Sequence, residues 1–449
     1  MAASGLHVII GLGATGFSCA KYLHECGIPF AMTDSRPNPP NLKACQDAFS
    51  DVIISVGELD ESLLEIAETI VISPGMSLQE PVIARQLARG TPVIGDIELF
   101  ARAVRVPVIA ITGTNAKSTV TTLVAKMAEK AGYQVQVGGN LGVPALDLLY
   151  RNPDTNLFVL EISSFQLETT SSLKPVVATV LNITPDHMDR YHTLDEYRQA
   201  KHRVYQHCKT VVCNFDDALT HIDAEYKFFF TMKEPGKNSF GLLTREGDSY
   251  LAFENQTLLS VKELPVIGKH YQANALAALA LGHAYGLPFA PMLEVLREFT
   301  GLPHRCQFVC EDNRVRWYND SKGTNVGATQ AAIQGLGDAI SGKLVLIAGG
   351  LGKNADFSSL VPAIATYCRH VVLIGEAASE LAKVIGDAVP CSFAQSMEDA
   401  VKQSASFAHP DDCVLLSPAC ASYDMFKNFE HRGQVFMDTV KNFHACLSF

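Results

Sequence analysis

The sequence predicts an α/β protein with three consecutive units, each built on a mainly parallel sheet that helices cover. Two observations support this fold class. Short apolar runs of strand length alternate with helical stretches along the chain, and glycine-containing turns follow several of these runs. The length of 449 residues agrees with several units, because domains usually hold roughly 100–200 residues each.

The first unit, expected over residues 1–96, alternates strands with helices as a Rossmann-like fold does. A helix is predicted over Gly16–Gly27, where a glycine ends it. The predicted strands are His7–Gly11, Phe30–Thr33, Thr69–Ser73 and Pro92–Gly95.

The second unit, expected over residues 97–302, opens with a buried-type strand that runs into a glycine turn and a helix. This order predicts a P-loop-like domain with a central parallel sheet. Residues 226–262 carry short alternating runs that suit a small antiparallel insertion. The predicted strands are Val106–Thr112, Leu157–Ile162, Val176–Asn182 and Thr210–Asn214, and the predicted helices are Ser118–Lys130 and Ala273–Gly286.

The tripeptide Gly301-Leu302-Pro303 is predicted to link the second unit to a third, expected over residues 303–449. Strands are predicted there at Lys343–Ala348, His370–Ile374 and Cys413–Ser417, with helical stretches between them. This pattern again indicates a Rossmann-like unit.

Bulk composition excludes several classes of function. The formal net charge of −11 argues against duplex nucleic acid as a partner, because phosphate binding needs a basic face. The opening residues do not resemble a signal peptide, and no window approaches 18 uninterrupted apolar residues, so we expect no membrane span. The 12 cysteines lack zinc-site spacing, which favours reduced thiols in a cytoplasmic protein.

The segment Gly11-Leu12-Gly13-Ala14-Thr15-Gly16 matches GxGxxG between a strand and a helix. Glycines there permit a tight turn and let a diphosphate approach the helix N-terminus. Asp34 ends the next strand, where a carboxylate can accept from a ribose hydroxyl. A dinucleotide cofactor, a UDP-type ligand and a purely structural turn all remain open from this motif.

The segment Thr112–Thr119 follows a strand and opens a helix, as a P-loop does. Its amides would cradle phosphates, Lys117 would neutralise them, and Ser118 or Thr119 would offer a hydroxyl to Mg²⁺. The match to a Walker A motif is incomplete, because Ala116 stands where glycine belongs before the lysine.

Polar residues follow two other predicted strands of the second unit. Glu161 ends one strand, where a carboxylate can hold Mg²⁺, and Asn182–Arg190 places two acids, a His and an Arg in one turn. His187 lies in this turn, at the sheet edge that carries the phosphate loop. Lys201 lies on a predicted helix, and its ordinary interpretation is a solvated lysine.

Three loops of the third unit are also polar. They are Asn319–Asn325, Gly349–Lys353 and Ser417–Ser422. Each loop could bind an anion, and each alone could be a plain connection.

Taken together, these segments resemble the Mur ligases, which add amino acids to the peptidoglycan precursor. The resemblance spans nearly the whole chain, and the run Asp424–Gly433 is characteristic of members that add D-glutamate. The matching segments, in family order, are Gly11–Gly16, Thr112–Thr119, Glu161–Leu167, Asp186–Tyr191, Gly301–Arg305, Asn319–Asn325 and Ser417–Gly433.

The resemblance implies an ATP-dependent amide-bond-forming ligase of cytoplasmic peptidoglycan synthesis, and hence a role in cell wall biogenesis, cell shape and cell division. It implies UDP-N-acetylmuramoyl-L-alanine and D-glutamate as substrates, joined through an acyl phosphate. It also implies ATP, Mg²⁺ as two ions, and a carbamate derived from CO₂ on Lys201. We expect a monomer.

The family's roles fall on matching residues of this sequence. The implied catalytic residues are Lys117, Glu161, His187 and Lys201, and the implied metal ligands are Ser118, Glu161, His187 and the carbamate of Lys201. The implied nucleotide-binding residues are Gly113, Thr114, Asn115, Ala116, Lys117, Ser118, Thr119, Asn274, Arg305 and Asp320. The implied substrate-binding residues are Thr15, Asp34, Ser35, Arg36, Gly75, Asn140 and Gln166 for the UDP substrate, and Lys322, Thr324, Lys353, Ser422, Tyr423 and Phe429 for D-glutamate.

Two residues depart from the family pattern. Ala116 replaces the usual glycine, and its methyl group demands ordinary backbone angles or slightly more room. Tyr423 stands where leucine is common.

Three rival classes fit the sequence less well. A Rossmann dehydrogenase leaves Thr112–Thr119 without a role, and the N-terminal glycine domain and Ser417–Gly433 argue against a folylpolyglutamate synthase. A non-catalytic nucleotide-binding module does not account for acids, a His and a Lys at one sheet edge.

Overall fold

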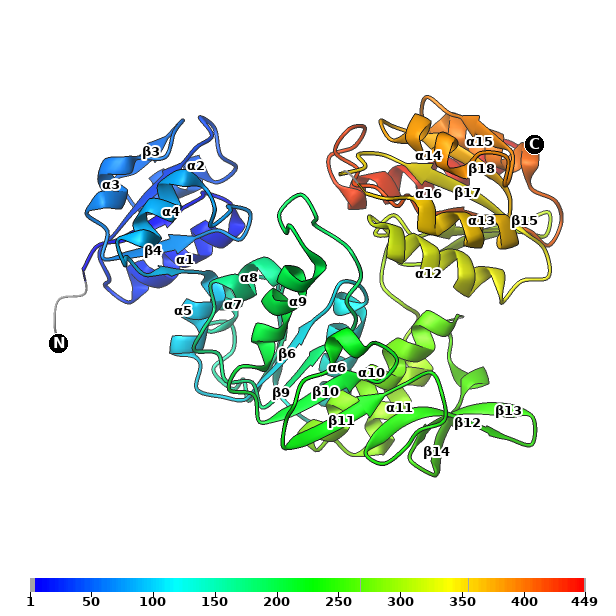
Figure 1. The fold of residues 1–449 in the computed structure, drawn as a ribbon, viewed down its shortest axis with the longest axis horizontal. Helices are drawn as coiled ribbons and strands as arrows, with labels where there is room; N and C mark the ends of the chain where they lie inside the picture. Colours follow the sequence, from blue (N-terminus) through cyan, green and yellow to red (C-terminus); the bar gives the residue numbers. More distant parts are fainter. Residues whose placement is uncertain (1–4, 267, 354, 448–449) are drawn as a thin grey trace.

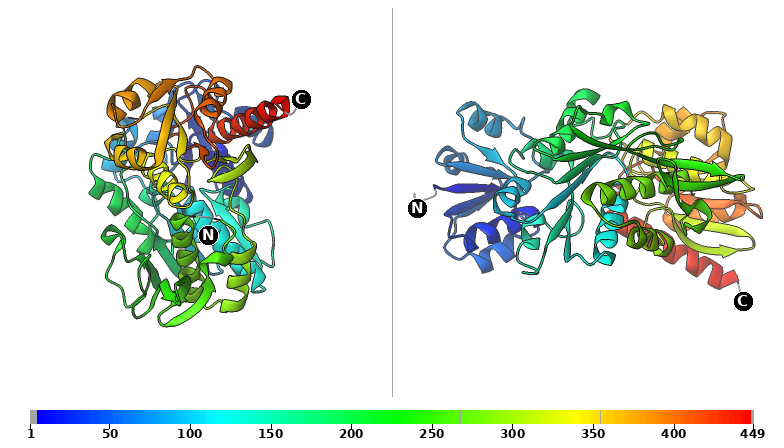
Figure 2. Two further views of the ribbon diagram at one scale, coloured as in Figure 1. Left: turned by 90° about the vertical axis from the view of Figure 1, so that its right-hand side faces the viewer. Right: turned by 90° about the horizontal axis from the view of Figure 1, so that it is seen from below.

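The computed structural model describes residues 5–266, 268–353 and 355–447. Figure 1 shows three α/β units in chain order, with the first and the third on either side of the central one. Each unit has its own sheet, so the predicted three-unit α/β fold is confirmed. In the right-hand view of Figure 2 the first and third units lie toward opposite ends of the molecule, with the central unit between them.

The first sheet has the strand order β3-β2-β1-β4-β5, and all of its described pairings are parallel. This is the order of one half of a Rossmann fold, extended by two strands on the other side of β1. The sequence pattern missed β3 because it has only three residues, all partly exposed. The strands are β1 His7–Ile10, β2 Phe30–Asp34, β3 Ile54–Val56, β4 Thr69–Ile72 and β5 Val93–Ile94, and the helices are α1 Ala14–Glu25, α2 Leu42–Ala48, α3 Glu61–Glu65 and α4 Pro81–Ala88.

The central sheet has the order β14-β13-β12-β11-β10-β9-β6-β8-β7. Its buried middle strands form one core with the long helices α6 and α10, which explains the continuous apolar runs in their sequences. The strands are β6 Val108–Thr112, β7 Val135–Gly139, β8 Leu157–Glu161, β9 Val177–Val180, β10 Thr210–Asn214, β11 Tyr226–Phe230, β12 Ser239–Arg245, β13 Asp248–Phe253 and β14 Gln256–Ser260. The helices are α5 Asp96–Ala103, α6 Lys117–Lys130, α7 Ala145–Leu148, α8 Ser164–Glu168, α9 Leu194–His202, α10 Lys269–Tyr285 and α11 Phe289–Glu298.

The prediction of an antiparallel insertion over residues 226–262 is correct only in part. β12, β13 and β14 form an antiparallel meander, but β11 pairs in parallel with β10 and with β12. β11 therefore extends the parallel sheet, and the meander follows from it. Alternation along a strand shows which side is buried but does not give the direction of its neighbour.

The third sheet has the order β15-β16-β20-β17-β18-β19, with only the β15–β16 hairpin antiparallel among its described pairings. The predicted strands correspond to β17, β18 and β20. The strands are β15 Gln307–Asp312, β16 Val315–Asn319, β17 Leu344–Gly349, β18 Cys368–Ile374, β19 Cys391–Phe393 and β20 Cys413–Leu416. The helices are α12 Val326–Gly337, α13 Val361–Tyr367, α14 Ala378–Ile385, α15 Met397–Phe407 and α16 Phe429–Leu447.

Strand register brings three functional segments to one edge of the central sheet. Ile111 pairs with Glu161 on one side of β6, and Thr112 pairs with Val180 on the other. The phosphate loop, Glu161 and the turn after β9 therefore leave the sheet at neighbouring carboxyl ends, where α/β proteins bind ligands.

None of the described helices has both the length and the apolar character that crossing a membrane requires.

The glycine loop of the first unit depends on close contact between its ends. A Cβ atom built on Gly16 would lie 1.8 Å from the carbonyl oxygen of Gly11, whereas one built on Gly13 would have no neighbour within 4 Å. We predict that Gly16→Ala lowers the free energy of unfolding by about 3 kcal/mol, because the backbone must move apart. Gly13→Ala should remain within about 1 kcal/mol of the wild type. Urea unfolding followed by circular dichroism tests this, and equal midpoints for the two variants would contradict it.

Candidate active site

The turn between β6 and α6 has the geometry of an anion-binding loop. Gly113 has a φ of 152°, and Ala116 has a φ of 69° just before α6 begins. No described side chain caps this helix, so its first amides remain open toward the loop. Amides at a helix N-terminus favour negative groups, and the loop therefore suits phosphate.

The expectation that Ala116 would require ordinary backbone angles is wrong. Its φ of 69° and ψ of −10° are left-handed, which is the conformation that a glycine would adopt easily. The left-handed conformation costs an L-residue about 1–2 kcal/mol. The loop geometry is therefore kept at the expense of local strain.

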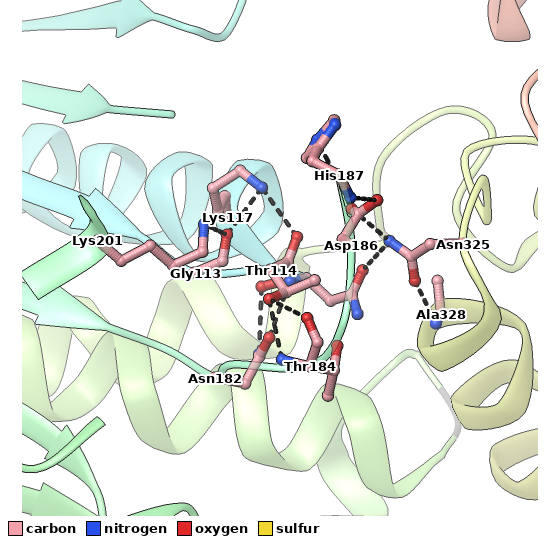
Figure 3. A network of polar contacts seen from close by, with 11 residues as sticks. Gly113, Thr114, Lys117, Asn182, Thr184, Asp186, His187, Lys201, Asn325 and Ala328 are labelled. Atoms are coloured by element: carbon pink, nitrogen blue, oxygen red, sulfur yellow. Dashed lines mark hydrogen bonds and ion pairs between the residues drawn. The ribbon is translucent and has the colours of Figure 1, made fainter. Parts of the chain in front are cut away.

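The turn after β9 holds the phosphate loop in place (Figure 3). The amide of Thr114 donates to the carbonyl of Asn182 at 2.9 Å, and the amide of Asn115 donates to Oδ1 of Asn182 at 2.8 Å. The hydroxyl of Thr114 donates to the carbonyl of Thr184 at 3.1 Å and accepts from the Thr184 amide at 3.1 Å. These four hydrogen bonds fix the conformation of the phosphate loop.

Two lysine side chains meet at the carbonyl oxygen of Gly113. Nζ of Lys117 lies 3.0 Å from this oxygen and 2.9 Å from the carbonyl of Thr114. Nζ of Lys201 lies 2.9 Å from the same Gly113 oxygen, and Lys201 is only 1% exposed. Burial lowers the pKa of Lys201 well below its ordinary value, and the charge of Lys117 adds to this effect. The interpretation of Lys201 as a solvated lysine is therefore wrong.

Glu161 is the buried carboxylate of this edge. Its Oε1 accepts from Nδ2 of Asn140 at 2.7 Å, while its Oε2 is buried without a hydrogen-bond partner. A buried carboxylate oxygen normally has a partner. Glu161 therefore has room for one more donor or for a cation.

His187 lies in the turn after β9 and has a left-handed backbone conformation, with a φ of 57°. Its ring is half-buried and packs edge-on against Phe165 at 4.8 Å between centroids. Burial lowers the pKa of His187, Asp186 opposes this, and the charge of Lys353 reinforces it. A neutral imidazole is therefore favoured at neutral pH, and a neutral imidazole can accept a proton or bind a metal.

A cavity of about 310 Å³ opens beside the phosphate loop, between the central and third units. Arg305 lines it and donates from Nη2 to the hydroxyl of Ser118 at 2.7 Å. Burial raises the pKa of Asp320, another lining residue, to about 6. The predicted nucleotide residues in its lining are Asn115, Ala116, Thr119, Asn274, Arg305 and Asp320, joined by Lys322 from the predicted D-glutamate set.

A second cavity, of about 530 Å³, lies between the glycine loop of the first unit and the central unit. Asp34 accepts from the amide of Leu12 at 2.7 Å and from Nη2 of Arg36 at 2.7 Å. Burial alone would raise the pKa of Asp34, but these hydrogen bonds lower it overall. The predicted UDP-side residues all line this cavity: Thr15, Asp34, Ser35, Arg36, Gly75, Asn140 and Gln166.

Arg190 ties the second cavity to the His187 turn. Its Nη1 donates to the carbonyl of Pro74 at 2.7 Å, and its Nη2 donates to Glu168 at 2.7 Å. Its guanidinium also lies 4.0 Å from the centroid of the Phe165 ring. The backbone before Gly75 is therefore fixed to the central unit.

The predicted D-glutamate residues are brought together only in part. Nζ of Lys322 lies 3.7 Å from the centroid of the Phe429 ring, and burial lowers the pKa of Lys322 to about 8. Ser422 is buried, whereas the side chain of Tyr423 is 69% exposed. Thr324, Lys353, Ser422, Tyr423 and Phe429 line neither of the two cavities.

Several polar residues at these sites were not singled out from the sequence. Nδ1 of His270 and the hydroxyl of Tyr271 are buried without partners, and both residues line the nucleotide cavity. Arg432 is fully buried and donates to Ser321 and to the carbonyls of Cys420 and Ala421, which joins two loops of the third unit. Arg432 lies within the run Asp424–Gly433 that marks the family resemblance, but no role was predicted for it.

A phosphate loop with a polar cavity on each side fits an enzyme that brings a nucleoside triphosphate together with a second substrate. Family models match the chain as the Mur ligase MurD-like N-terminal domain at residues 5–95, the Mur ligase middle domain at 111–282 and the Mur ligase glutamate ligase domain at 304–420.

Curated relatives match over nearly the full length. A UDP-N-acetylmuramoylalanine–D-glutamate ligase of Pseudomonas putida is 53% identical, and the match covers 97% of each chain. The protein of that name from Pseudomonas aeruginosa is 50% identical over 98% of this chain and 99% of its own. Among solved structures, MurF ligase of Thermotoga maritima in complex with ADP shares the fold, with a TM-score of 0.63, 16% identity, and 98% and 96% coverage. The chain belongs to the Mur ligase family and is an ATP-dependent ligase.

The strained conformation of Ala116 predicts a stabilising substitution. We expect Ala116→Gly to raise the free energy of unfolding by up to about 1 kcal/mol, because glycine removes the left-handed strain but adds entropy to the unfolded chain. Ala84→Gly, on the exposed face of α4, is the matched control and should lower it by about 1 kcal/mol. Urea unfolding measures both, and a loss of stability in Ala116→Gly equal to that of the control would contradict the prediction.

Proposed function

We propose that this ligase joins D-glutamate to UDP-N-acetylmuramoyl-L-alanine in peptidoglycan precursor synthesis. The observation that supports this most directly is the position of Glu161. It hydrogen-bonds Asn140 of the 530 Å³ cavity, and its charge acts on Lys117 and Arg305 of the nucleotide side. A substrate carboxylate held in the 530 Å³ cavity can therefore meet the triphosphate of a nucleotide held in the 310 Å³ cavity. The relatives at 50–53% identity carry the name of this activity.

The cavity next to the glycine loop is assigned to the UDP substrate. The loop amides and Thr15 would meet the diphosphate, and Asp34, Ser35 and Arg36 would meet the uridine. Gly75, Asn140 and Gln166 would line the path of the sugar and alanyl group toward Glu161. Since Arg36 already pairs with Asp34, its guanidinium is placed without needing the ligand.

The nucleotide is assigned to the phosphate loop and the 310 Å³ cavity. The backbone of Gly113–Ala116 would hold the phosphates, Lys117 would neutralise them, and Ser118 and Thr119 would offer hydroxyls. Asn274 would meet the base, and Asp320 and Arg305 would meet the ribose and phosphates. D-Glutamate is assigned to Lys322, Thr324, Lys353, Ser422, Tyr423 and Phe429. The two lysines of this set suit the two carboxylates of D-glutamate.

The residues at this edge fit Mg²⁺. The described residues include no cluster of three or more His, Cys, Asp or Glu side chains able to hold a metal. Phosphate and hydroxyl oxygens would complete the ligand set in this proposal. The unpartnered Oε2 of Glu161 is an oxygen donor of the kind that Mg²⁺ prefers. Ser118, Glu161, His187 and a carbamate on Lys201 would hold two ions, which would neutralise charge on the phosphates.

The surroundings of Lys201 suit carbamylation. Its lowered pKa provides the neutral amine that attacks CO₂. Lys201 is only 1% exposed, and this burial protects the product from water. A carbamate would convert this amine into an oxygen-donor anion at the sheet edge that carries Glu161. We assign this modification to Lys201 for that reason.

The reaction proceeds in two steps. The alanyl carboxylate attacks the γ-phosphorus of ATP, giving an acyl phosphate and ADP, while Lys117 stabilises charge on the transferred group. The amine of D-glutamate then attacks the acyl carbon, and the tetrahedral intermediate expels phosphate. His187, held neutral by burial, orients the amine or accepts its proton.

A cytoplasmic monomer is the setting that we assign to this reaction. The described cysteines are all free thiols, which suits a reducing compartment. Residues of one chain form both cavities and the loop between them.

The proposed specificity is tested by phosphate release from ATP with UDP-N-acetylmuramoyl-L-alanine and one amino acid at a time. D-Glutamate should give at least about tenfold more release than L-lysine, diaminopimelate or L-alanine. Lys117→Ala should abolish release, because the charge on the phosphoryl group loses its cation. Equal rates with all four amino acids would overturn the assignment of the substrate.

The carbamate is tested by Lys201→Ala. The variant should lose activity by about 100-fold or more, and short carboxylates such as acetate should restore part of it. Lys237→Ala, at an exposed position of the central unit, is the control and should retain full activity. Wild-type activity of Lys201→Ala without any added carboxylate would remove the carbamate from the mechanism.

A further inference from the structure

Asn325 is the residue of the third unit that bonds directly to both functional turns of the central unit (Figure 3). Its Nδ2 donates to Oδ1 of Asn115 in the phosphate loop at 3.1 Å and to Oδ2 of Asp186 at 3.1 Å. Its Oδ1 accepts from the amide of Ala328 at 2.9 Å and caps α12. One carboxamide therefore uses both hydrogens across the domain boundary and its oxygen within its own helix.

The two partners of Asn325 are already fixed in the central unit. Asn115 is held by Asn182, whose Oδ1 accepts from the Asn115 amide at 2.8 Å. Asp186 accepts from the amide of His187 at 2.9 Å through its other oxygen. Asn325 therefore touches one residue that shapes the phosphate loop and one that fixes the backbone of His187.

Close packing supports the same contact. A Cβ atom built on Gly327 would lie 3.1 Å from the hydroxyl oxygen of Thr184 and 3.5 Å from Nδ2 of Asn115. The first turn of α12 therefore packs tightly against Thr184 in the turn after β9 and is in ordinary contact with Asn115 of the phosphate loop. A methyl group at Gly327 would require Thr184 to move by a few tenths of an ångström.

We propose that Asn325 is a positioning residue, which latches the third unit onto the phosphate loop and the His187 turn so that the two halves of the site assemble together. The inference rests on the proposed function, because the third unit supplies the amino-acid side of that reaction. A bare helix cap would need only the Oδ1 atom. The two donated bonds to another domain have no role in capping.

Three variants separate the latch from the cap. Asn325→Ser and Asn325→Asp both keep an oxygen that can cap α12, and both lose the bridging donors. Asn325→Asp also places a carboxylate next to Asp186, so the domains should repel. Gly327→Ala should stabilise α12 by itself, since alanine favours helix, while its methyl group pushes Thr184 and the turn after β9 away from the third unit. Asn152→Asp is the matched control, because Asn152 lies in the loop before β8, at the opposite edge of the sheet.

The measurements are D-glutamate-dependent phosphate release, urea unfolding, and the radius of gyration from small-angle X-ray scattering with ADP and both substrates. We expect kcat to fall at least about tenfold in Asn325→Ser, further in Asn325→Asp and also in Gly327→Ala. The radius of gyration with ligands should exceed that of the wild type in all three, while the unfolding midpoints stay close to it. The double variant Asn325→Asp/Asp186→Asn should return the radius toward the wild-type value, because the amide of residue 186 can then donate to residue 325.

Wild-type kcat and radius in both Asn325 variants would overturn the latch. A reduced kcat with an unchanged radius would also overturn it, because Asn325 would then act within one unit. Wild-type enzyme that releases no phosphate with D-glutamate would instead overturn the proposed function, and the scattering comparison would still decide the latch.

Discussion

The carbonyl oxygen of Gly113 is the point on which the site depends. It accepts hydrogen bonds from Lys117 and from Lys201, two amines that would repel each other if both were charged. Gly113, with a φ of 152°, directs its carbonyl oxygen toward both amines. The strands β6, β8 and β9 bring the phosphate loop, Glu161 and the turn after β9 to the same sheet edge.

Burial then determines the protonation of the site. The cations near the nucleotide cavity, Lys117, Arg305 and Lys322, all have a pKa lowered first by burial. Glu161 opposes this in each case, and it is the carboxylate that these three cations share. The arrangement keeps positive charge where phosphate binds and leaves an acidic oxygen for a cation.

Local patterns in the sequence predicted most of the buried strands and both glycine-containing loops, because a turn between a strand and a helix is specified by a few adjacent residues. They missed β3, β7, β15, β16 and β19. Lys201 could not be placed in this way. Its helix is strongly charged, and only the fold brings that helix against the phosphate loop. The contact of Asn325 with Asp186 likewise joins segments that are 139 residues apart. The left-handed Ala116 and the parallel direction of β11 are not specified by the apolar patterns from which the strands were predicted. Resemblance to a family supplied the role of Lys201, since composition and spacing indicated an ordinary surface residue.

Arg190 has a mechanical consequence. Its planar guanidinium spans from the carbonyl of Pro74 to Glu168, and Arg190 lies three residues after His187 in the same turn. Two of its nitrogens are therefore anchored at once, one on the wall of the 530 Å³ cavity and one in the central unit. The Pro74 backbone and the turn that carries His187 cannot move far apart without breaking the hydrogen bond from Arg190 to Pro74.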